Sequence, residues 1–376
     1  MKANSNLDSV STMAAENNGL AQVDMNQFKK LKSMQFPRTV VVGNKALEKL
    51  PESIKSLKLS GKTLIICDGT TRQIAGDKAS ELLDENGFET SIYEIEDASQ
   101  KTVDDITENS KGEYEFFLGV GGGRSIDVAK YASYLLDVSF ISIPTASSHD
   151  GIASGRASIN RNGNKISVAA QSPLAVVADT SIIANSPYRL MASGCADIIS
   201  NETAVLDWQL ARRLRNEHYS HYAANLSKMT ASSLIDNADS IKPGLEESAW
   251  LIVKALVSSS VAMSIAGSSR PASGSEHKFS HALDEMVEKP ALHGEQCGVG
   301  TIIMMYLHGG DWKRIKYALE KVGAPTTARG LDLTEEEVIQ ALMHAPEIRP
   351  NRYTILGNRR MNREAAEEAA KETGII

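Results

Sequence analysis

The feature that most constrains this chain is a regular alternation of short apolar runs with amphipathic helical segments between Phe36 and about residue 186. The apolar runs, rich in β-branched residues, fall at 37–43, 63–67, 89–96, 115–120, 139–145 and 173–183. Segments with helical periodicity lie between them, at 45–57, 77–88, 103–112 and 124–136. Strands that alternate with helices favour a parallel sheet covered on both faces, so this half is predicted to be α/β.

The remaining segments indicate how the chain is divided. Short alternating stretches surround Asn162-Gly163, and this dipeptide between such stretches predicts a β-hairpin. After Pro187 the periodicity is helical, with no convincing strand. We therefore predict a disordered tail or a region upstream of a start at Met25, then an α/β domain and an all-helical domain. Their predicted bounds are 1–24, 25–186 and 187–376.

Composition narrows the class of protein. At roughly 150 residues per domain, 376 residues suggest two or three domains. A net charge of −7 argues against a surface that binds nucleic acid or anionic membrane over the whole protein. Three well-separated cysteines exclude a disulfide framework and favour a reducing cytoplasm. We expect neither a transmembrane helix nor a signal peptide.

A glycine-rich turn, Gly119–Ser125, falls between a predicted strand and a predicted helix. Glycines there allow the backbone to approach a phosphate closely, and the helix N-terminus offers unpaired N–H groups and a partial positive charge. The spacing is not the G-x-G-x-x-G of the standard dinucleotide fingerprint. A tight structural turn is the alternative.

Polar residues also follow two other predicted strands. Asp68 ends the strand at 63–67, where a carboxylate can accept hydrogen bonds from a ribose, or can simply cap the turn at Gly69. The segment 144–151, PTASSHDG, follows the strand at 139–145 with hydroxyls, an imidazole and a carboxylate. Open α/β sheets bind ligands at this edge, although a plain polar loop is the alternative.

Histidines gather in the helical half. Three of the eight, His277, His281 and His293, fall within 17 residues and suggest a metal-ligand cluster rather than stray surface side chains. Since His277 and His281 are i and i+4 on a helix, spacing alone makes them the ligand pair. Asp197 lies on an otherwise apolar helix and needs a partner, either a metal or a hydrogen-bond donor.

These motifs together resemble the archaeal-type sn-glycerol-1-phosphate dehydrogenases, within the wider group of metal-dependent glycerol dehydrogenases, iron-type alcohol dehydrogenases and 3-dehydroquinate synthases. The resemblance runs from about Phe36 to the C-terminus and is carried by GVGGGRSIDVAK, IPTASSHDGIASGRASI, SGCADIISNETAVLDW, SGSEHKFSHALD and LHGEQCGVG. It implies an α/β nucleotide domain, a helical domain and an active site in the cleft between them.

The resemblance also implies roles for particular residues. It implies that Asp197, His277 and His293 bind one zinc ion per subunit. This set of ligands replaces the pair His277 and His281 that helical spacing alone suggested. His281 and Asp150 become catalytic, substrate-binding residues, and Asp197 also contacts the substrate. Cys195 and Cys297 flank the metal motifs and stay alternatives as ligands, because thiolates bind zinc well. The implied NAD or NADP site consists of Asp68 at the adenosine ribose, Gly121, Gly122, Gly123, Arg124 and Ser125 at the pyrophosphate, and Thr145, Ala146, Ser147, Ser148 and Ser154.

The implied reaction is the reversible reduction of dihydroxyacetone phosphate to sn-glycerol 1-phosphate, for archaeal membrane phospholipids, in a cytoplasmic homo-oligomer. A substrate phosphate is expected to bind to cationic side chains. The motif segments contain four candidates, and the sequence alone does not show which of them binds it: Arg156, Lys165, Arg270 and Lys278. A glycerol dehydrogenase without substrate phosphate is the main alternative. Two further alternatives are a 3-dehydroquinate synthase, which would show no net NADH consumption, and a nucleotide-binding module without catalysis. Such a module would not need the metal ligands Asp197, His277 and His293.

Overall fold

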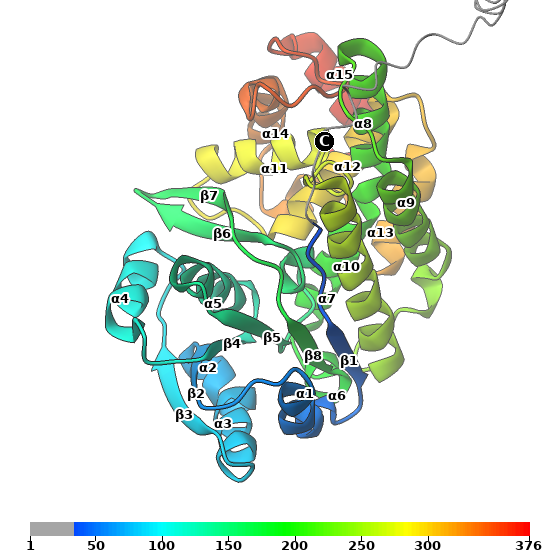
Figure 1. Cartoon of the computed structure of the whole chain (residues 1–376). Helices are drawn as coiled ribbons and strands as arrows, with labels where there is room; N and C mark the ends of the chain where they lie inside the picture. The colour runs from blue at the N-terminus through cyan, green and yellow to red at the C-terminus, as the bar shows by residue number, and fades with distance from the viewer. Residues whose placement is uncertain (1–33) are drawn as a thin grey trace, which may run out of the picture. The chain divides into compact units, whose positions relative to one another are not determined.

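A six-stranded parallel sheet forms the core of the first half of the structure (Figure 1). The computed structural model describes residues 34–376, so the predicted tail lies outside the described residues. The strand order is β1-β8-β5-β4-β2-β3, and each neighbouring pair is parallel. The strands are β1 (Thr39–Gly43), β2 (Lys62–Cys67), β3 (Glu89–Glu94), β4 (Phe116–Gly121), β5 (Ser139–Pro144) and β8 (Ala175–Asp179).

Helices cover both faces of this sheet because its strands alternate apolar side chains between the faces. Ile65 on β2 packs into one cluster with α1 (Leu50–Ser56) and α3 (Asp77–Asp84). Its neighbours Leu64 and Ile66 face the other way and pack with α4 (Gln100–Ser110) and α5 (Gly123–Leu136). All the predicted strands of the sheet are present, although the last one ends at Asp179, beyond which the predicted run 173–183 is helical.

The order of the strands creates one switch point. From β2 the chain goes to β3 on one side, and β4 then returns to the other side of β2. Ligands of open α/β sheets bind in the crevice outside the carboxyl ends of the strands at such a point. Here Asp68 follows β2 and the turn Gly121–Gly123 ends β4, so both predicted nucleotide-binding features lie at the switch point.

A separate hairpin, β6 (Arg156–Arg161) and β7 (Asn164–Ala169), confirms the Asn-Gly prediction. Asn162 and Gly163 have φ values of 54° and 82°, the two positive values of a type I′ turn. In the view of Figure 1 the hairpin lies between α5 and α11 (Ser275–Met286). The hairpin thus reaches from the sheet half toward the helical half.

Beyond Pro187 the described residues contain helices and no strand. The long helices are α7 (Tyr188–Ile199), α8 (Asn201–Arg215), α9 (His221–Asp236), α10 (Glu246–Ala266), α11, α12 (His293–Leu307), α13 (Trp312–Lys321), α14 (Glu335–His344) and α15 (Arg363–Glu372). One buried apolar cluster runs from the sheet face under α4 and α5 into these helices. The domain boundary near 186/187 therefore stays a prediction.

Short elements differ from the sequence-based expectations. The predicted helix 45–57 is a 3-10 turn, η2 (Ala46–Lys49), followed by α1, with Pro51 in the first turn of α1. The segment after Asp68, expected to be a turn, is helical as α2 (Gly69–Thr71) and the π-helical η3 (Arg72–Gly76). Five more short helices complete the described chain: η4 (Asp150–Ile152), α6 (Thr180–Ala184), η5 (Ala238–Ser240), η6 (Arg329–Leu331) and η7 (Ala345–Glu347).

Helix α10 is long and apolar enough, by length and composition, to cross a membrane. This is weak evidence, because half of its apolar window is buried inside the protein and core helices pass the same test. Two of its serines, Ser259 and Ser260, donate hydrogen bonds to Asp150, the first to the side chain and the second to the backbone carbonyl. Helix α10 therefore behaves here as a core helix next to the candidate site.

Candidate active site

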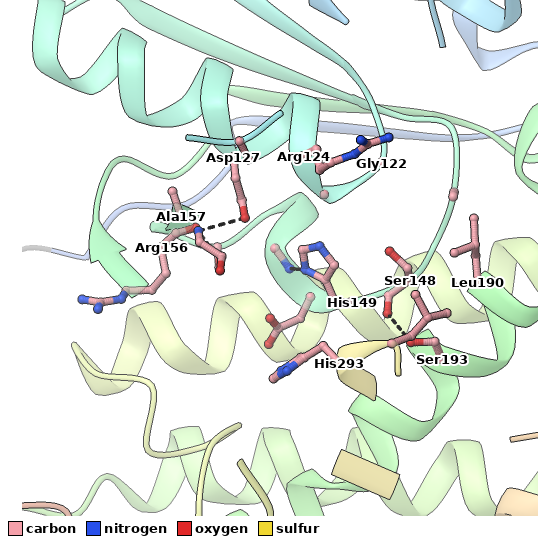
Figure 2. Close-up of a pocket in the computed structure, with 18 of the residues that line it drawn as sticks. Gly122, Arg124, Asp127, Ser148, His149, Arg156, Ala157, Leu190, Ser193 and His293 are labelled. Atoms are coloured by element: carbon pink, nitrogen blue, oxygen red, sulfur yellow. Dashed lines mark hydrogen bonds between the residues drawn. The ribbon is translucent and has the colours of Figure 1, made fainter. Parts of the chain in front are cut away.

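A cavity of about 1110 Å³ lies beside the carboxyl ends of the strands, and the helical half forms its opposite wall. Its lining includes the glycine turn after β4, the loop after β5, and residues of α11 and α12. In the view of Figure 2, Gly122 and Arg124 lie above the His149 ring and His293 lies below it. The two groups of motifs that the sequence suggested thus meet at one cavity.

Two glycines of the turn after β4, Gly122 and Gly123, have different surroundings. A Cβ on Gly123 would lie 2.1 Å from His149 Nε2, so a side chain at this position would displace the His149 ring. A Cβ on Gly122 would meet no protein atom within 4 Å, although Gly122 lines the cavity. Because α5 begins at Gly123 and its first N–H groups lack partners within the helix, this cradle fits a phosphate.

Asp68 serves the local fold and faces the cavity as well. Its side chain accepts a hydrogen bond of 2.9 Å from the backbone N–H of Thr71, as the turn-capping alternative requires. Its second oxygen lies 3.3 Å from Nη2 of Arg124. Both Asp68 and Arg124 line the cavity, at the switch point. Capping therefore leaves the second carboxylate oxygen beside the cavity, where it is paired with the Arg124 guanidinium.

The loop after β5 is fixed by a buried ion pair that the sequence analysis did not identify. Lys130 and Asp127, both on α5, are 3.0 Å apart, and Lys130 is fully buried. Lys130 also donates a hydrogen bond of 2.6 Å to the Gly151 carbonyl, and the Gly151 N–H donates to His149 Nδ1 at 2.9 Å. The ion pair thus sets the position of the His149 ring against the glycine turn.

The predicted cofactor residues of this loop, together with Ser125 of α5, divide into two groups. Thr145, Ala146, Ser148 and Ser154 line the cavity. Ser125 and Ser147 are buried, and neither hydroxyl has a hydrogen-bond partner within the described structure. Buried hydroxyls are normally paired, but neither of these two serines lines the cavity, so their place in a cofactor site stays a prediction.

At the opposite end of the cavity, four side chains form a donor cluster. Asp197 from α7, His277 from α11, and His293 and Cys297 from α12 place their donor atoms within 4.8 Å of one another. Asp197 Oδ1 lies 3.8 Å from Nε2 of each histidine, and Cys297 Sγ lies 3.6 Å from His293 Nε2. Four-coordinate zinc separates its donor atoms by roughly 3.3–3.7 Å, so the spacing fits such an ion.

Neighbouring side chains orient these donors. Glu276 lies 3.0 Å from His277 Nδ1, and Ser280 lies 3.1 Å from His293 Nδ1. Both contacts leave Nε2 of each ring directed at Asp197, as in metal sites where a second residue fixes the imidazole. A Cβ on Gly294 would lie 1.9 Å from the Ser193 carbonyl oxygen, so the glycine after His293 allows α12 to begin directly against α7.

Burial shifts the protonation of the cluster toward neutral forms. It raises the pKa of Asp197 to about 7, and the neighbouring Asp150 adds to this rise. Burial lowers the pKa of His293 well below its usual value, and the charge of His277 contributes. A buried cluster of nitrogen and oxygen donors whose charged forms are disfavoured fits a divalent cation, because the cation offsets the cost of the ionised carboxylate.

Asp150 and His281 lie at the edge of this cluster. The backbone N–H of Asp150 donates to Asp197 Oδ2 at 3.1 Å, and its side chain accepts from Ser259 at 3.1 Å. His281 lines the cavity, and its ring centroid is 5.9 Å from that of His293. It is not part of the donor cluster, so the pairing of His277 with His281 from spacing alone was wrong for this geometry.

Comparison with known proteins identifies the family. Residues 41–187 match the model for iron-containing alcohol dehydrogenases. The glycerol-1-phosphate dehydrogenase (NAD(P)+) of Methanosarcina acetivorans is 58% identical over 346 residues, 92% of this chain and 97% of that protein. The protein of the same name from Methanothermobacter thermautotrophicus is 54% identical over 92% of this chain and 99% of its own length. The chain belongs to the glycerol-1-phosphate dehydrogenase family.

Solved structures bear out the fold of this family member. Glycerol dehydrogenase from Schizosaccharomyces pombe superposes with a TM-score of 0.77 at 20% identity, covering 92% of this chain and 90% of that one. NADH-dependent butanol dehydrogenase A from Thermotoga maritima gives 0.70 at 17% identity, covering 91% and 98%. The predicted combination of an α/β half and a helical half, of the dehydroquinate synthase-like type, is confirmed, as is the oxidoreductase class.

The cations predicted for substrate phosphate do not all reach the cavity of this family member. Arg156 and Lys165 line it. Arg270 does not, because its guanidinium is paired with Glu217, and Lys278 is buried behind the wall, 3.4 Å from the Pro346 carbonyl oxygen. A cation that the sequence analysis did not single out, Arg349, lines the cavity instead.

Proposed function

We propose that this chain catalyses the reversible reduction of dihydroxyacetone phosphate to sn-glycerol 1-phosphate with NADH or NADPH. One observation carries the proposal. A single cavity is lined by the glycine turn at the switch point and by His277 and His293 of the donor cluster. A dehydrogenase that depends on both a dinucleotide and a metal needs this pairing. The names of the relatives at 54–58% identity agree with it.

The dinucleotide would lie along the edge of the sheet. The N–H groups at Gly122, Gly123 and the start of α5 bind the pyrophosphate, since a side chain at Gly122 would occupy that space. Asp68 accepts hydrogen bonds from the adenosine ribose. Arg124, Ser125, Thr145, Ala146, Ser147, Ser148 and Ser154 complete the proposed cofactor site.

Asp197, His277 and His293 would hold one zinc ion per subunit, with Cys297 beside them. When bound, the nicotinamide carries the hydride and zinc acts as a Lewis acid toward the substrate carbonyl. The protein residues fix which face of the ketone meets the hydride. They therefore determine which enantiomer forms.

Asp150 and His281 orient the substrate hydroxyls and move the proton at the reduced oxygen. Burial lowers the pKa of His281, so its imidazole is neutral near pH 7 and can accept or donate a hydrogen bond. Burial raises the pKa of Asp150, although the neighbouring His149 opposes the shift. Its side chain is held by Ser259 and its N–H by Asp197, so Asp150 is fixed beside the metal ligands.

We further propose that the α/β half over 25–186 binds the dinucleotide and the helical half over 187–376 carries the metal and substrate. The enzyme would act in the cytoplasm as a homo-oligomer without nucleic-acid partners, and would supply the glycerophosphate backbone of archaeal membrane phospholipids.

The test compares rates of NADH or NADPH oxidation by the zinc-loaded enzyme with dihydroxyacetone phosphate and with unphosphorylated dihydroxyacetone. The proposal predicts a much larger kcat/KM for the phosphorylated ketone. Similar values for both, or turnover with the unphosphorylated ketone alone, would indicate a glycerol dehydrogenase. Turnover of a substrate without net NADH consumption would indicate a lyase of the 3-dehydroquinate synthase type.

A further inference from the structure

The geometry points to Arg349, assisted by Lys165, as the site that binds the phosphate group of the substrate. This inference rests on the proposed function and names the part of the cavity that distinguishes a phosphorylated substrate from an unphosphorylated one. The ligand chemistry is a phosphate monoester dianion.

Arg349 lines the cavity as a half-buried side chain, and no hydrogen bond or ion pair of its guanidinium is found among residues 34–376. Its neighbours in the same part of the protein are engaged. Arg270 is paired with Glu217, and Arg352 donates to the Ser273 carbonyl at 2.6 Å and to Ser269 Oγ at 2.8 Å. A partly buried guanidinium without an anion is costly, and a bound phosphate removes that cost.

The electrostatic surroundings place Arg349 at the metal end of the cavity. Burial lowers its own pKa, and the charge of Arg156 adds to the effect. Burial also lowers the pKa of His281; Asp284 opposes this shift, and the Arg349 charge adds to it. Arg349 and His281 line the same cavity, so a phosphate bound next to His281 lies within the field of the Arg349 charge.

The backbone at Arg349 is unusual in a way that favours a functional role. Its φ is 47°, a left-handed value that is uncommon for a residue with a side chain. It also precedes Pro350, and a following proline restricts the backbone further. Such conformations persist where the surrounding structure enforces them, often at ligand sites. Here the short segment after η7 presents the guanidinium to the cavity.

Lys165 provides a second cation from the other wall. It belongs to β7 of the hairpin, lines the cavity and has no ion pair within residues 34–376. A planar guanidinium can bind two phosphate oxygens, and an ammonium can approach the third.

The phosphates of the dinucleotide do not compete for this pair of cations. The adenosine end of the cavity has its own cation, Arg124, which lies beside Asp68 at the switch point. A 2′-phosphate of NADP would meet Arg124 rather than Arg349. The pyrophosphate would meet the glycine turn. Arg349 is therefore assigned to the substrate.

The experiment measures kcat/KM of the zinc-loaded enzyme for dihydroxyacetone phosphate and for dihydroxyacetone, in the wild type, Arg349→Ala, Arg349→Lys and Arg359→Ala. Arg359 is a matched control because it is an exposed arginine of the same C-terminal segment and does not line the cavity. We expect Arg349→Ala to lower kcat/KM for the phosphorylated ketone about 100-fold, as expected for loss of charge-assisted hydrogen bonds. The unphosphorylated ketone should change less than about threefold. Arg349→Lys should recover part of the loss, and Arg359→Ala should match the wild type.

Binding supplies a readout that does not depend on turnover. Titration with inorganic phosphate by calorimetry should show weaker binding in Arg349→Ala and in Lys165→Ala, with unchanged zinc content and unchanged KM for NADH. Equal losses on both ketones, or unchanged kcat/KM for the phosphorylated ketone, would overturn the assignment. If the wild type itself does not prefer the phosphorylated ketone, the proposed function fails, and this inference fails with it. If the wild type has this preference and Arg349→Ala keeps it, only this inference fails.

Discussion

At the scale of single residues, His277 and His281 lie one turn apart on α11, yet only His277 belongs to the donor cluster. The second imidazole of the cluster comes from the first residue of α12. His281 instead faces the cavity beside the cluster. Two side chains of one helix thus lie in different surroundings, because a second helix supplies the remaining imidazole of the cluster.

We predict that His281→Ala retains zinc but lowers kcat/KM for dihydroxyacetone phosphate by about 10²–10⁴, the usual range for a positioned acid–base group. The matched variant His293→Ala should lose zinc and turnover together. Elemental analysis and steady-state kinetics on the same preparations decide between these roles. Zinc-free His281→Ala, or full zinc occupancy in His293→Ala, would contradict the assignment.

Zinc affinity should depend on pH through Asp197. Burial raises the pKa of this carboxyl group to about 7 in the metal-free protein, so below pH 7 a proton must leave before the metal binds. Burial keeps His293 neutral over the same range, so it adds no proton. Competition with a chelator should show a dissociation constant that rises up to about tenfold per pH unit below 7 and levels off above it. A constant value from pH 5.5 to 8.5 would exclude this linkage.

At the scale of secondary-structure elements, two neighbouring glycines in the turn between β4 and α5 have different purposes. Gly123 leaves room for the His149 ring, and Gly122 leaves room for a ligand. Gly122→Ala places a methyl group in open space and should leave thermal stability unchanged while raising the KM for NADH. Gly123→Ala forces His149 to move, so it should lower the melting temperature as well. Thermal unfolding and NADH kinetics of both variants test this. An unchanged KM in Gly122→Ala would make the turn purely structural.

The sheet and its helices could be predicted from the sequence because the apolar periodicity that defines them is local. The hairpin could be predicted because Asn162-Gly163 has a specific turn chemistry. The helical turns after Asp68 could not, since Gly69 and Gly76 at their ends are typical of loops. A local cap, in which Asp68 accepts from the Thr71 N–H, and the packing of Ala75 in the apolar cluster against the sheet decide that segment.

The candidate site could be predicted only in part, for a similar reason. The motifs contain the cluster residues, but helical spacing favoured His281 over His293 as a ligand. The direction of α12 after Pro290 determines that choice, and no local pattern encodes it. Arg349 lies far along the chain from the metal motifs, in a short segment after η7, and only the folded structure brings it to the cavity.

At the scale of the whole molecule, the donor cluster connects three helices, α7, α11 and α12. A ligand that binds only the folded state stabilises it. Removal of zinc by a chelator should therefore lower the melting temperature, and added zinc should restore it. Calorimetry of the stripped and reloaded enzyme measures the shift. Equal melting temperatures would show that the cluster does not hold a metal tightly.

The cavity gives the molecule its proposed chemistry, because it joins the cofactor cradle at the sheet edge to the donor cluster in the helical half. The most direct test is the stereochemistry of the product. Material formed from dihydroxyacetone phosphate and NADH by the zinc-loaded enzyme is treated with a dehydrogenase specific for sn-glycerol 3-phosphate. We expect no oxidation of this product, and glycerophosphate formed in an amount equal to the NADH consumed. Oxidation of the product, or the absence of glycerophosphate, would contradict it.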